Sequence, residues 1–291
     1  MSSPVLVHCH MFKNAGSTLD WSLERLFGHA FVDHRDDEPM RNEAGYLKTW
    51  LETHPKVNAV SSHHVPLPLP TLAGREVFGM YLLRQPIDRV GSVYQFERKQ
   101  DAETPGAIHA KQLSFNDYVQ WRMREDVGAT IREFQTRYCS GAMKARKLDP
   151  SHLDSAKTAL AASPFVGVVD RYDESMVVFE QALGNVGYCP DLAYTAQNQG
   201  KRASTPMSQR IEQVLDGLEE TTRAALAANN ALDSALYDYA NALLSERIAT
   251  IPDFDAKLAD FHARCADPKP IAPLSAGSRV KRFLKGLGGR H

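Results

Sequence analysis

The chain has few cysteines and no long apolar run. Its 291 residues include four cysteines, and no two of them stand in a CxxC spacing. This argues against a paired-cysteine zinc site and gives no disulfide framework. No apolar stretch of about eighteen residues is present, and the amino terminus lacks the charged, apolar and small-residue pattern of a signal peptide. We therefore expect a cytoplasmic protein with reduced, mostly buried thiols.

Charge is nearly balanced overall but unevenly distributed. The net charge is −1, yet residues 268–291 contain six basic residues and no acidic one, which leaves −7 on residues 1–267. We interpret residues 1–267 as a single domain and residues 268–291 as a basic tail. The tail is either a solvated terminus or a short amphipathic helix that contacts the inner face of an anionic membrane.

The first chemical signal is a small-residue loop between an apolar strand and a helix. Residues 5–9 predict a strand and residues 19–27 an amphipathic helix. Unpaired amides at a helix start bind phosphate or sulfate, and Lys13 adds a full charge. Lys13 precedes Gly16 by three residues, whereas in a Walker A loop the lysine follows the second glycine. The alternative is an ordinary helix start capped by Ser17 or Thr18.

The second signal is an arginine at the end of an apolar strand. Residues 77–83 predict a buried strand, Arg84 ends it, and a helix begins at Pro86. Ser92 follows Arg84 by eight residues. A planar guanidinium can donate two parallel hydrogen bonds to a phosphate. The alternative is that Arg84 pairs with a carboxylate and Ser92 is a small helix-packing residue.

These two segments, in this order, resemble the two cofactor motifs of the sulfotransferases that use 3′-phosphoadenosine-5′-phosphosulfate (PAPS), closest to carbohydrate sulfotransferases. The resemblance extends in order over about residues 5–245. It implies an α/β fold of the P-loop-NTPase-like type, with a central, mostly parallel sheet flanked by helices and a largely helical middle insertion. It also implies that the 3′-phosphate is bound by Arg84 and Ser92, and that the 5′-phosphosulfate loop consists of Lys13, Asn14, Ala15, Gly16, Ser17 and Thr18.

A histidine pair lies between the two motifs and suggests a catalytic base. His64-Val65-Pro66 aligns with a Gly-His-x-Pro segment of carbohydrate sulfotransferases, although His63 replaces the glycine. We expect His64 to act as the base, with His63 as second choice; the alternative is a hydrogen-bonded loop histidine without a catalytic task. Lys13 would stabilise the leaving 5′-phosphate, so no metal is expected.

Histidines on the first strand suggest a metal pair that lacks a partner. His8 and His10 share one face of the strand, but the sequence offers no visible third ligand at a matching distance. We expect His10 to shape the loop.

Other basic residues are weaker candidates. Arg137 lies in a Gln-Thr-Arg segment that faces the acceptor in several sulfotransferases; the alternative is an exposed helix charge. Lys201 and Arg202 lie in a loop that could clamp the 3′-phosphate. The expected partner is a hydroxyl-bearing small molecule or saccharide, including a glycolipid precursor, and no nucleic acid is expected.

Two other functions remain open. A P-loop nucleotide kinase would need a magnesium-binding hydroxyl directly after the lysine, where Asn14 stands. A non-catalytic nucleotide- or glycan-binding module would keep Arg84 and Ser92 but would not need Lys13 and His64.

The remaining pattern alternates strands and helices. Short strands are expected within residues 56–62 and 164–170. Helices are expected over residues 115–124, 127–138, 151–162 and 206–228, with one ending near Gly184 and a closing helix from about residue 229.

Overall fold

Five parallel strands form the centre of the molecule. The computed structural model describes residues 3–195 and 205–268. Its sheet has the order β2-β3-β1-β4-β5, and every neighbouring pair is parallel. The strands are β1 (Val5–Cys9), β2 (Phe31–Asp33), β3 (Ala59–Ser62), β4 (Val77–Leu83) and β5 (Phe165–Val168). The expected α/β class, with a parallel sheet flanked by helices, is confirmed, and the strand order is compatible with a P-loop-like fold.

Helices connect these strands and cover them. The first half of the chain contains α1 (Gly16–Phe27), α2 (Asp37–Asn42), α3 (Tyr46–Thr53), α4 (Pro86–Lys99), α5 (Pro105–Gln112), α6 (Phe115–Arg122) and α7 (Phe134–Cys139). The second half contains α8 (Pro150–Ala161), α9 (Tyr172–Asn185), α10 (Met207–Asp216), α11 (Glu220–Ala228), α12 (Ala231–Ala249) and α13 (Phe254–Ala266). Between β4 and β5 the chain is mainly helical, from α4 to α8.

Alternate residues of each strand supply two separate cores. On one face, Val5 and Val7 belong to a buried cluster with side chains of α3, α8 and α12. On the other, Leu6 packs in a cluster with side chains of α1, α9 and α13. Successive side chains of a strand point to opposite faces, so an apolar run such as 5–7 buries both sides. The molecule is therefore layered, with helices on each face of the sheet.

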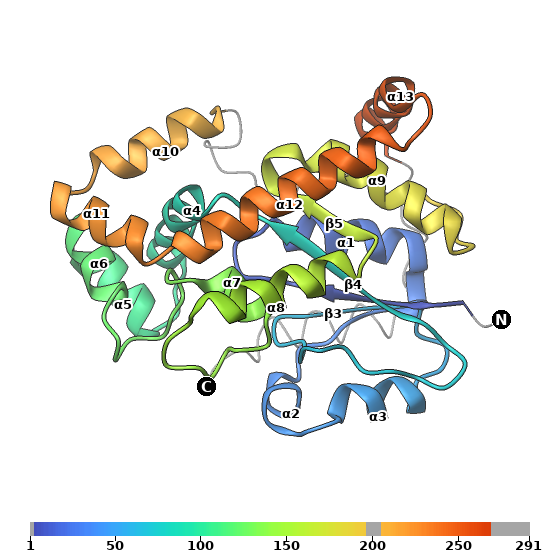
Figure 1. The fold of residues 1–291 in the computed structure, drawn as a ribbon, viewed down its shortest axis with the longest axis horizontal. Helices are drawn as coiled ribbons and strands as arrows, with labels where there is room; N and C mark the ends of the chain where they lie inside the picture. Colours follow the sequence, from blue (N-terminus) through green and yellow to red (C-terminus); the bar gives the residue numbers. More distant parts are fainter. Residues whose placement is uncertain (1–2, 196–204, 269–291) are drawn as a thin grey trace.

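A third apolar cluster lies beyond the sheet. It joins α4, α5, α6, α10 and α11 around residues such as Val90 and Tyr118. In Figure 1 these helices gather at the end of the molecule opposite the amino terminus. β1 runs from the amino terminus toward that end. This helical group therefore faces the carboxyl ends of the strands.

β1 lies where the strand order reverses. β3 pairs with one edge of β1 and β4 with the other, and the sheet continues from β3 to β2 on one side and from β4 to β5 on the other. In open parallel sheets, ligands bind in the crevice outside the carboxyl ends at such a point. The loop after β1, which contains Lys13, starts at this crevice.

Two helix predictions differ from the structure. The helix expected over residues 127–138 is wrong in its first half: α7 begins only at Phe134, because Glu133 has a left-handed backbone (φ 45°) that interrupts a helix. The helix expected over 206–228 is divided into α10 and α11 around Gly217. β2 was not predicted, since three residues are too few for a period to emerge.

None of the helices in the two described stretches is both long and apolar enough to span a membrane. The basic tail lies almost wholly outside the described residues, and so does its predicted helix.

Candidate functional site

The loop between β1 and α1 has an unusual backbone. Lys13 and Ala15 both have left-handed conformations, with φ values of 66° and 60°. Within the described part of the chain, no hydrogen-bond acceptor takes the backbone N–H of Ala15, Gly16 or Ser17. Alternating backbone conformations that turn successive amides to one side form anion-binding concavities, and α1 adds its positive dipole end. The loop therefore has the backbone geometry of an anion-binding concavity.

Lys13 lies at the junction of the loop and an aromatic side chain. Its Nζ is 4.5 Å from the centroid of the Phe96 ring. Burial lowers the pKa of Lys13, and the nearby charges of Arg84, Arg89 and Lys99 lower it further. A bound anion would oppose this effect, because it favours the charged ammonium.

A buried histidine packs against the loop at Gly16. A Cβ added to Gly16 would lie 2.2 Å from Cδ2 of His10, so only glycine leaves room for this imidazole. His10 donates through Nδ1 to Asp20 on α1 at 2.8 Å, and His8 donates to the same carboxylate at 2.7 Å. Burial alone would raise the pKa of Asp20, but its bonds to the two histidines outweigh burial and hold it well below the usual value.

These three side chains form the cluster that the sequence left incomplete. His8, His10 and Asp20 have ligand-type atoms within 4.8 Å of one another. The structure thus supplies the third group that a metal pair would need. The carboxylate oxygens of Asp20 are 2.7 Å and 2.8 Å from the two Nδ1 atoms. These are hydrogen-bond distances, so hydrogen bonds account for the arrangement of the three side chains.

The second motif lies directly against the first. Arg84, at the end of β4, donates through Nη1 to the carbonyl oxygen of Lys13 at 3.0 Å. Its Nε donates to Asp88 at 2.8 Å, while no described residue accepts from its Nη2. Asp88 also accepts two hydrogen bonds from Arg210 on α10, at 2.7 and 3.0 Å. One carboxylate, 1% exposed, therefore orients two guanidinium groups beside the loop.

Ser92 lies one turn beyond Asp88 on α4. Residues four apart share a helix face, so Ser92 follows Asp88 along the same side of the helix. No described residue forms a hydrogen bond with its hydroxyl, and the side chain is partly exposed. Arg84 and Ser92 are thus available to a ligand, although Arg84 also has the carboxylate partner that the alternative interpretation named.

A fully buried amide ties the two motifs together. Gln135 on α7 accepts from Nδ2 of Asn14 at 2.7 Å and from the backbone N–H of Arg84 at 2.8 Å. Its own Nε2 donates to the Arg84 carbonyl at 2.8 Å. Asn14 therefore points into the protein. Its side-chain amide has a structural role, unlike the part expected of it in the phosphosulfate loop.

The two candidate bases differ in what their nitrogens contact. His63 donates through Nδ1 to the backbone oxygen of His10 at 2.8 Å, so Nε2 is the nitrogen left with a lone pair. Burial, aided by the charge of His10, lowers the pKa of His63 to about 3. His64 instead accepts through Nε2 from Arg41 at 2.9 Å. Burial and Arg41 lower its pKa. This geometry favours His63, the second choice from sequence, over His64.

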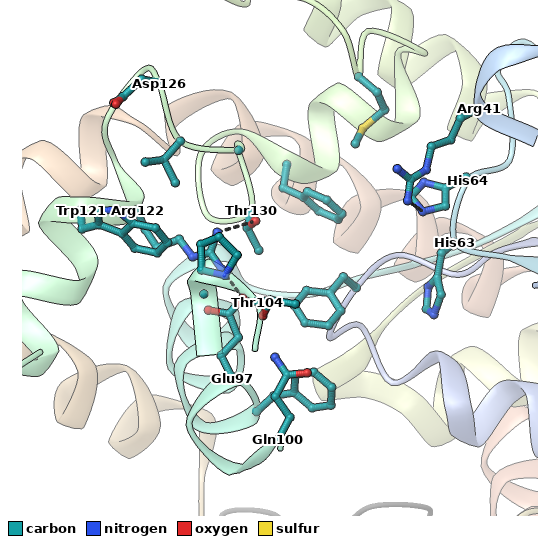
Figure 2. A pocket seen from close by; sticks show the side chains of 18 residues that line it. Arg41, His63, His64, Glu97, Gln100, Thr104, Trp121, Arg122, Asp126 and Thr130 are labelled. Carbon is teal, nitrogen blue, oxygen red and sulfur yellow. Dashed lines mark hydrogen bonds and ion pairs between the residues drawn. The ribbon is translucent and has the colours of Figure 1, made fainter. Parts of the chain in front are cut away.

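A pocket of about 730 Å³ opens beside His63. Figure 2 shows Arg41, His63 and His64 at one end and Trp121, Arg122 and Asp126 at the other. Apolar side chains, among them Phe12 and Phe96, also line the pocket. The volume is within the usual range for small-molecule sites, about 300–1,000 Å³.

The weaker candidates fare differently. Arg137 is 4% exposed and donates to the backbone oxygens of Ala145 and Arg146; it is not among the residues that line the pocket. Its position therefore does not support the expected contact with an acceptor. The alternative, an exposed helix charge, is also wrong, because the guanidinium is buried and hydrogen-bonded to backbone oxygens. Lys201 and Arg202 lie outside the described residues.

Sequence reasoning missed three contributors. Asp88 was recognisable as an acidic residue in a first helical turn, four residues after Arg84, but its bonds to Arg210 depend on α10, more than a hundred residues away. The pair Glu97 and Arg122 gives no local signal because the two residues belong to different helices.

Comparison with known proteins adds no functional assignment. No family model matches the chain. A protein of Archaeoglobus fulgidus that is described only as uncharacterized is 28% identical over 248 residues, which cover 82% of this chain and 96% of the archaeal protein. The similarity thus spans nearly the whole archaeal chain.

Proposed function

We propose that the protein transfers a sulfuryl group from PAPS to a hydroxyl acceptor, such as a carbohydrate or glycolipid precursor. One observation carries the proposal: the ends of β3, β1 and β4, which are neighbours in the sheet, bring His63, Lys13 and Arg84 together. Arg84 contacts the Lys13 carbonyl, and His63 contacts the His10 carbonyl. In this proposal Lys13 and Arg84 bind the anionic donor, and His63 acts as the base on the neighbouring strand end.

The groups present suit the two charged ends of the donor. The free amides of residues 15–17, with Lys13, match a 5′-phosphosulfate, and Arg84 with Ser92 matches a 3′-phosphate. PAPS supplies the sulfuryl group and leaves as the 3′,5′-bisphosphate.

The chain's own residues account for the proton and the charge. His63 Nε2 takes the acceptor's proton while the acceptor oxygen bonds to sulfur and the bond from sulfur to the bridging oxygen breaks. Lys13 and the loop amides stabilise the negative charge that the leaving phosphate gains. The low pKa of His63 keeps its imidazole neutral near neutral pH, with Nε2 unprotonated.

Ligand-induced stabilisation tests the donor. We expect 3′-phosphoadenosine 5′-phosphate (PAP), at about a hundred times its dissociation constant, to add about 2.7 kcal/mol to stability. ATP with magnesium and NAD should add much less. Arg84→Lys keeps the charge but loses the planar fork, so it should weaken PAP binding at least about tenfold. Arg98→Ala, at an exposed position of the same helix, is the control. A preference for ATP with magnesium would refute the proposal.

A further inference from the structure

We propose that the pocket beside His63 accepts an uncharged, polyhydroxylated molecule such as a neutral oligosaccharide, and that the buried pair of Glu97 and Arg122 at its far end determines this specificity. The inference rests on the proposed function, because it identifies the pocket as the acceptor site of that reaction. It adds the charge class of the acceptor and the residues that select it.

The near end of the pocket adjoins the proposed reaction centre. Phe96 lines the pocket and also lies under the Lys13 ammonium. Its ring packs edge-on against Phe12, which precedes Lys13, with centroids 5.3 Å apart. A hydroxyl that reaches the His63 end of the cavity therefore arrives beside the phosphosulfate loop.

The walls of the pocket expose apolar surface. Phe96 is 40% exposed and Met143 is 45% exposed, and both line the cavity. Exposed apolar side chains in a concave site indicate a ligand with apolar faces. The C–H face of a sugar ring provides such a surface.

The far end is polar, and its charges are paired: Asp126 with Arg124, and Glu97 with Arg122. Arg122 donates through Nη2 to Glu97, whose other oxygen accepts from Tyr118 at 2.5 Å. Arg122 also donates through Nη1 to Thr130 at 3.2 Å. Glu97 is 5% exposed and Arg122 is 7% exposed, yet both line the cavity. An isolated charge on a ligand would be attracted to one partner and repelled by the other, whereas a hydroxyl can donate to Glu97 and accept from Arg122 together.

A glycine keeps this pair in place. A Cβ on Gly106 would lie 2.0 Å from Nη2 of Arg122 and 2.5 Å from Oε1 of Glu97. The first turn of α5 thus packs directly on the ion pair and fixes its position. Gln100, Thr104 and Thr130 add uncharged hydrogen-bonding groups between the two ends.

Other acceptor classes match this pocket less well. A simple phenol has one polar end and would leave the Glu97–Arg122 end without a partner. An anionic acceptor would be repelled by the multiply charged donor once Lys13 and Arg84 are bound to it.

The test measures binding of the fluorescently labelled protein, in the presence of PAP, to an array of neutral and acidic glycans. Binding of 4-nitrophenol is measured separately by saturation-transfer NMR. We expect the bound glycans to be neutral. Binding confined to acidic glycans, to the phenol, or to none of these probes would overturn the inference.

Two variants examine the residues. Glu97→Gln leaves Arg122 uncompensated, so neutral-glycan binding should fall at least about tenfold and acidic glycans should gain. Glu174→Gln on α9, which breaks an ion pair with Arg171 just before that helix, should change neither. Should Glu97→Gln not fold, Phe96→Ala at its exposed position should weaken neutral-glycan binding with an unchanged melting temperature. If the folded variants selected the same glycans as the wild type, neither the Glu97–Arg122 pair nor Phe96 would determine specificity.

The two proposals fail in different ways. Stabilisation by PAP together with acidic or phenolic acceptors would refute the inference and leave the proposed function intact. Neutral-glycan binding without any response to PAP would refute the proposed function and identify a glycan-binding site instead.

Discussion

Lys13 has a backbone conformation that favours glycine, yet the position holds a long charged side chain. A non-glycine residue in the left-handed region costs on the order of 1 kcal/mol. Ala15 bears the same strain two residues later. Strain of this kind concentrates at functional sites, where the surrounding structure maintains it. Here it turns the amides of the loop outward.

Lys13→Ala should separate catalysis from binding. The lysine charge opposes negative charge that grows as the leaving phosphate departs, so we expect turnover to fall about 10²–10³-fold. PAP affinity should fall by less than about tenfold. Lys99→Ala, at an exposed position whose charge reaches the same site, is the matched control and should retain most activity. Near-normal turnover of the Lys13 variant with bound donor would disprove the role.

Substitution of each histidine should identify the base. His63→Ala removes the proposed base, so kcat should fall about 10²–10⁴-fold with little change in PAP affinity. His64→Ala should cost less than about tenfold, because Nε2 of His64 already accepts from Arg41. Kinetics of both variants under donor saturation provide the measurement. The reverse ranking would return the role to His64.

At the scale of elements, α7 and α12 cap each other. Asp233, near the start of α12, accepts from the backbone N–H groups of Gln135 and Thr136 at 3.0 and 2.7 Å. Glu133, just before α7, accepts from those of Leu232 and Asp233 at 3.0 and 2.7 Å. Both carboxylates thereby satisfy amides that a helix start leaves unpaired. The pair fixes α7, and with it Gln135.

Glu133 should make stability depend on pH. Burial, with the charge of Asp233, raises its pKa to about 7 from an ordinary value of 4.5. Between these values the folded protein binds a proton that the unfolded chain does not, so stability falls as pH rises from about 4.5 to about 7. The contribution is on the order of 1–3 kcal/mol. Denaturant melts at several pH values would measure it.

Glu133→Gln isolates this effect from those of other carboxyl groups. Glutamine still offers one acceptor oxygen, and it does not titrate. The difference in unfolding free energy between wild type and variant should therefore change across pH 4.5 to 7, with the wild type relatively more stable at the acid end. A constant difference across that range would contradict the assignment.

At the scale of the whole molecule, the sequence predicted local features better than connections. The strand of residues 77–83 and the loop at Lys13 follow from period and composition, and the structure contains both. The hydrogen bond of Arg84 to Lys13 and the choice between His63 and His64 depend on which strands are neighbours. The pairing of Glu97 with Arg122 depends on helix packing. Such contacts are set by tertiary structure, which no local pattern encodes.

Gln135 connects distant parts of the fold at one buried point. It is 0% exposed, and its amide joins the loop after β1 to the end of β4 through Asn14 and Arg84. Gln135→Ala removes the side-chain partner of the Arg84 N–H and carbonyl and one of the two hydrogen bonds that Asn14 Nδ2 donates, the other going to the Leu82 carbonyl. An unsatisfied buried group costs about 1–3 kcal/mol, so we expect a loss of at least about 2 kcal/mol of stability.

The same substitution should weaken the donor site without touching it. The Gln135 amide binds both Asn14 and the backbone of Arg84, so PAP affinity should fall several-fold in Gln135→Ala at a temperature where the variant is folded. Gln120→Ala, which removes an exposed amide bonded to Thr222 on the helical group, should cost less than about 0.5 kcal/mol and leave PAP binding unchanged. If Gln135→Ala were destabilised but bound PAP normally, the prediction would be wrong. The pairing of β1 with β4 would then suffice to keep Lys13 beside Arg84.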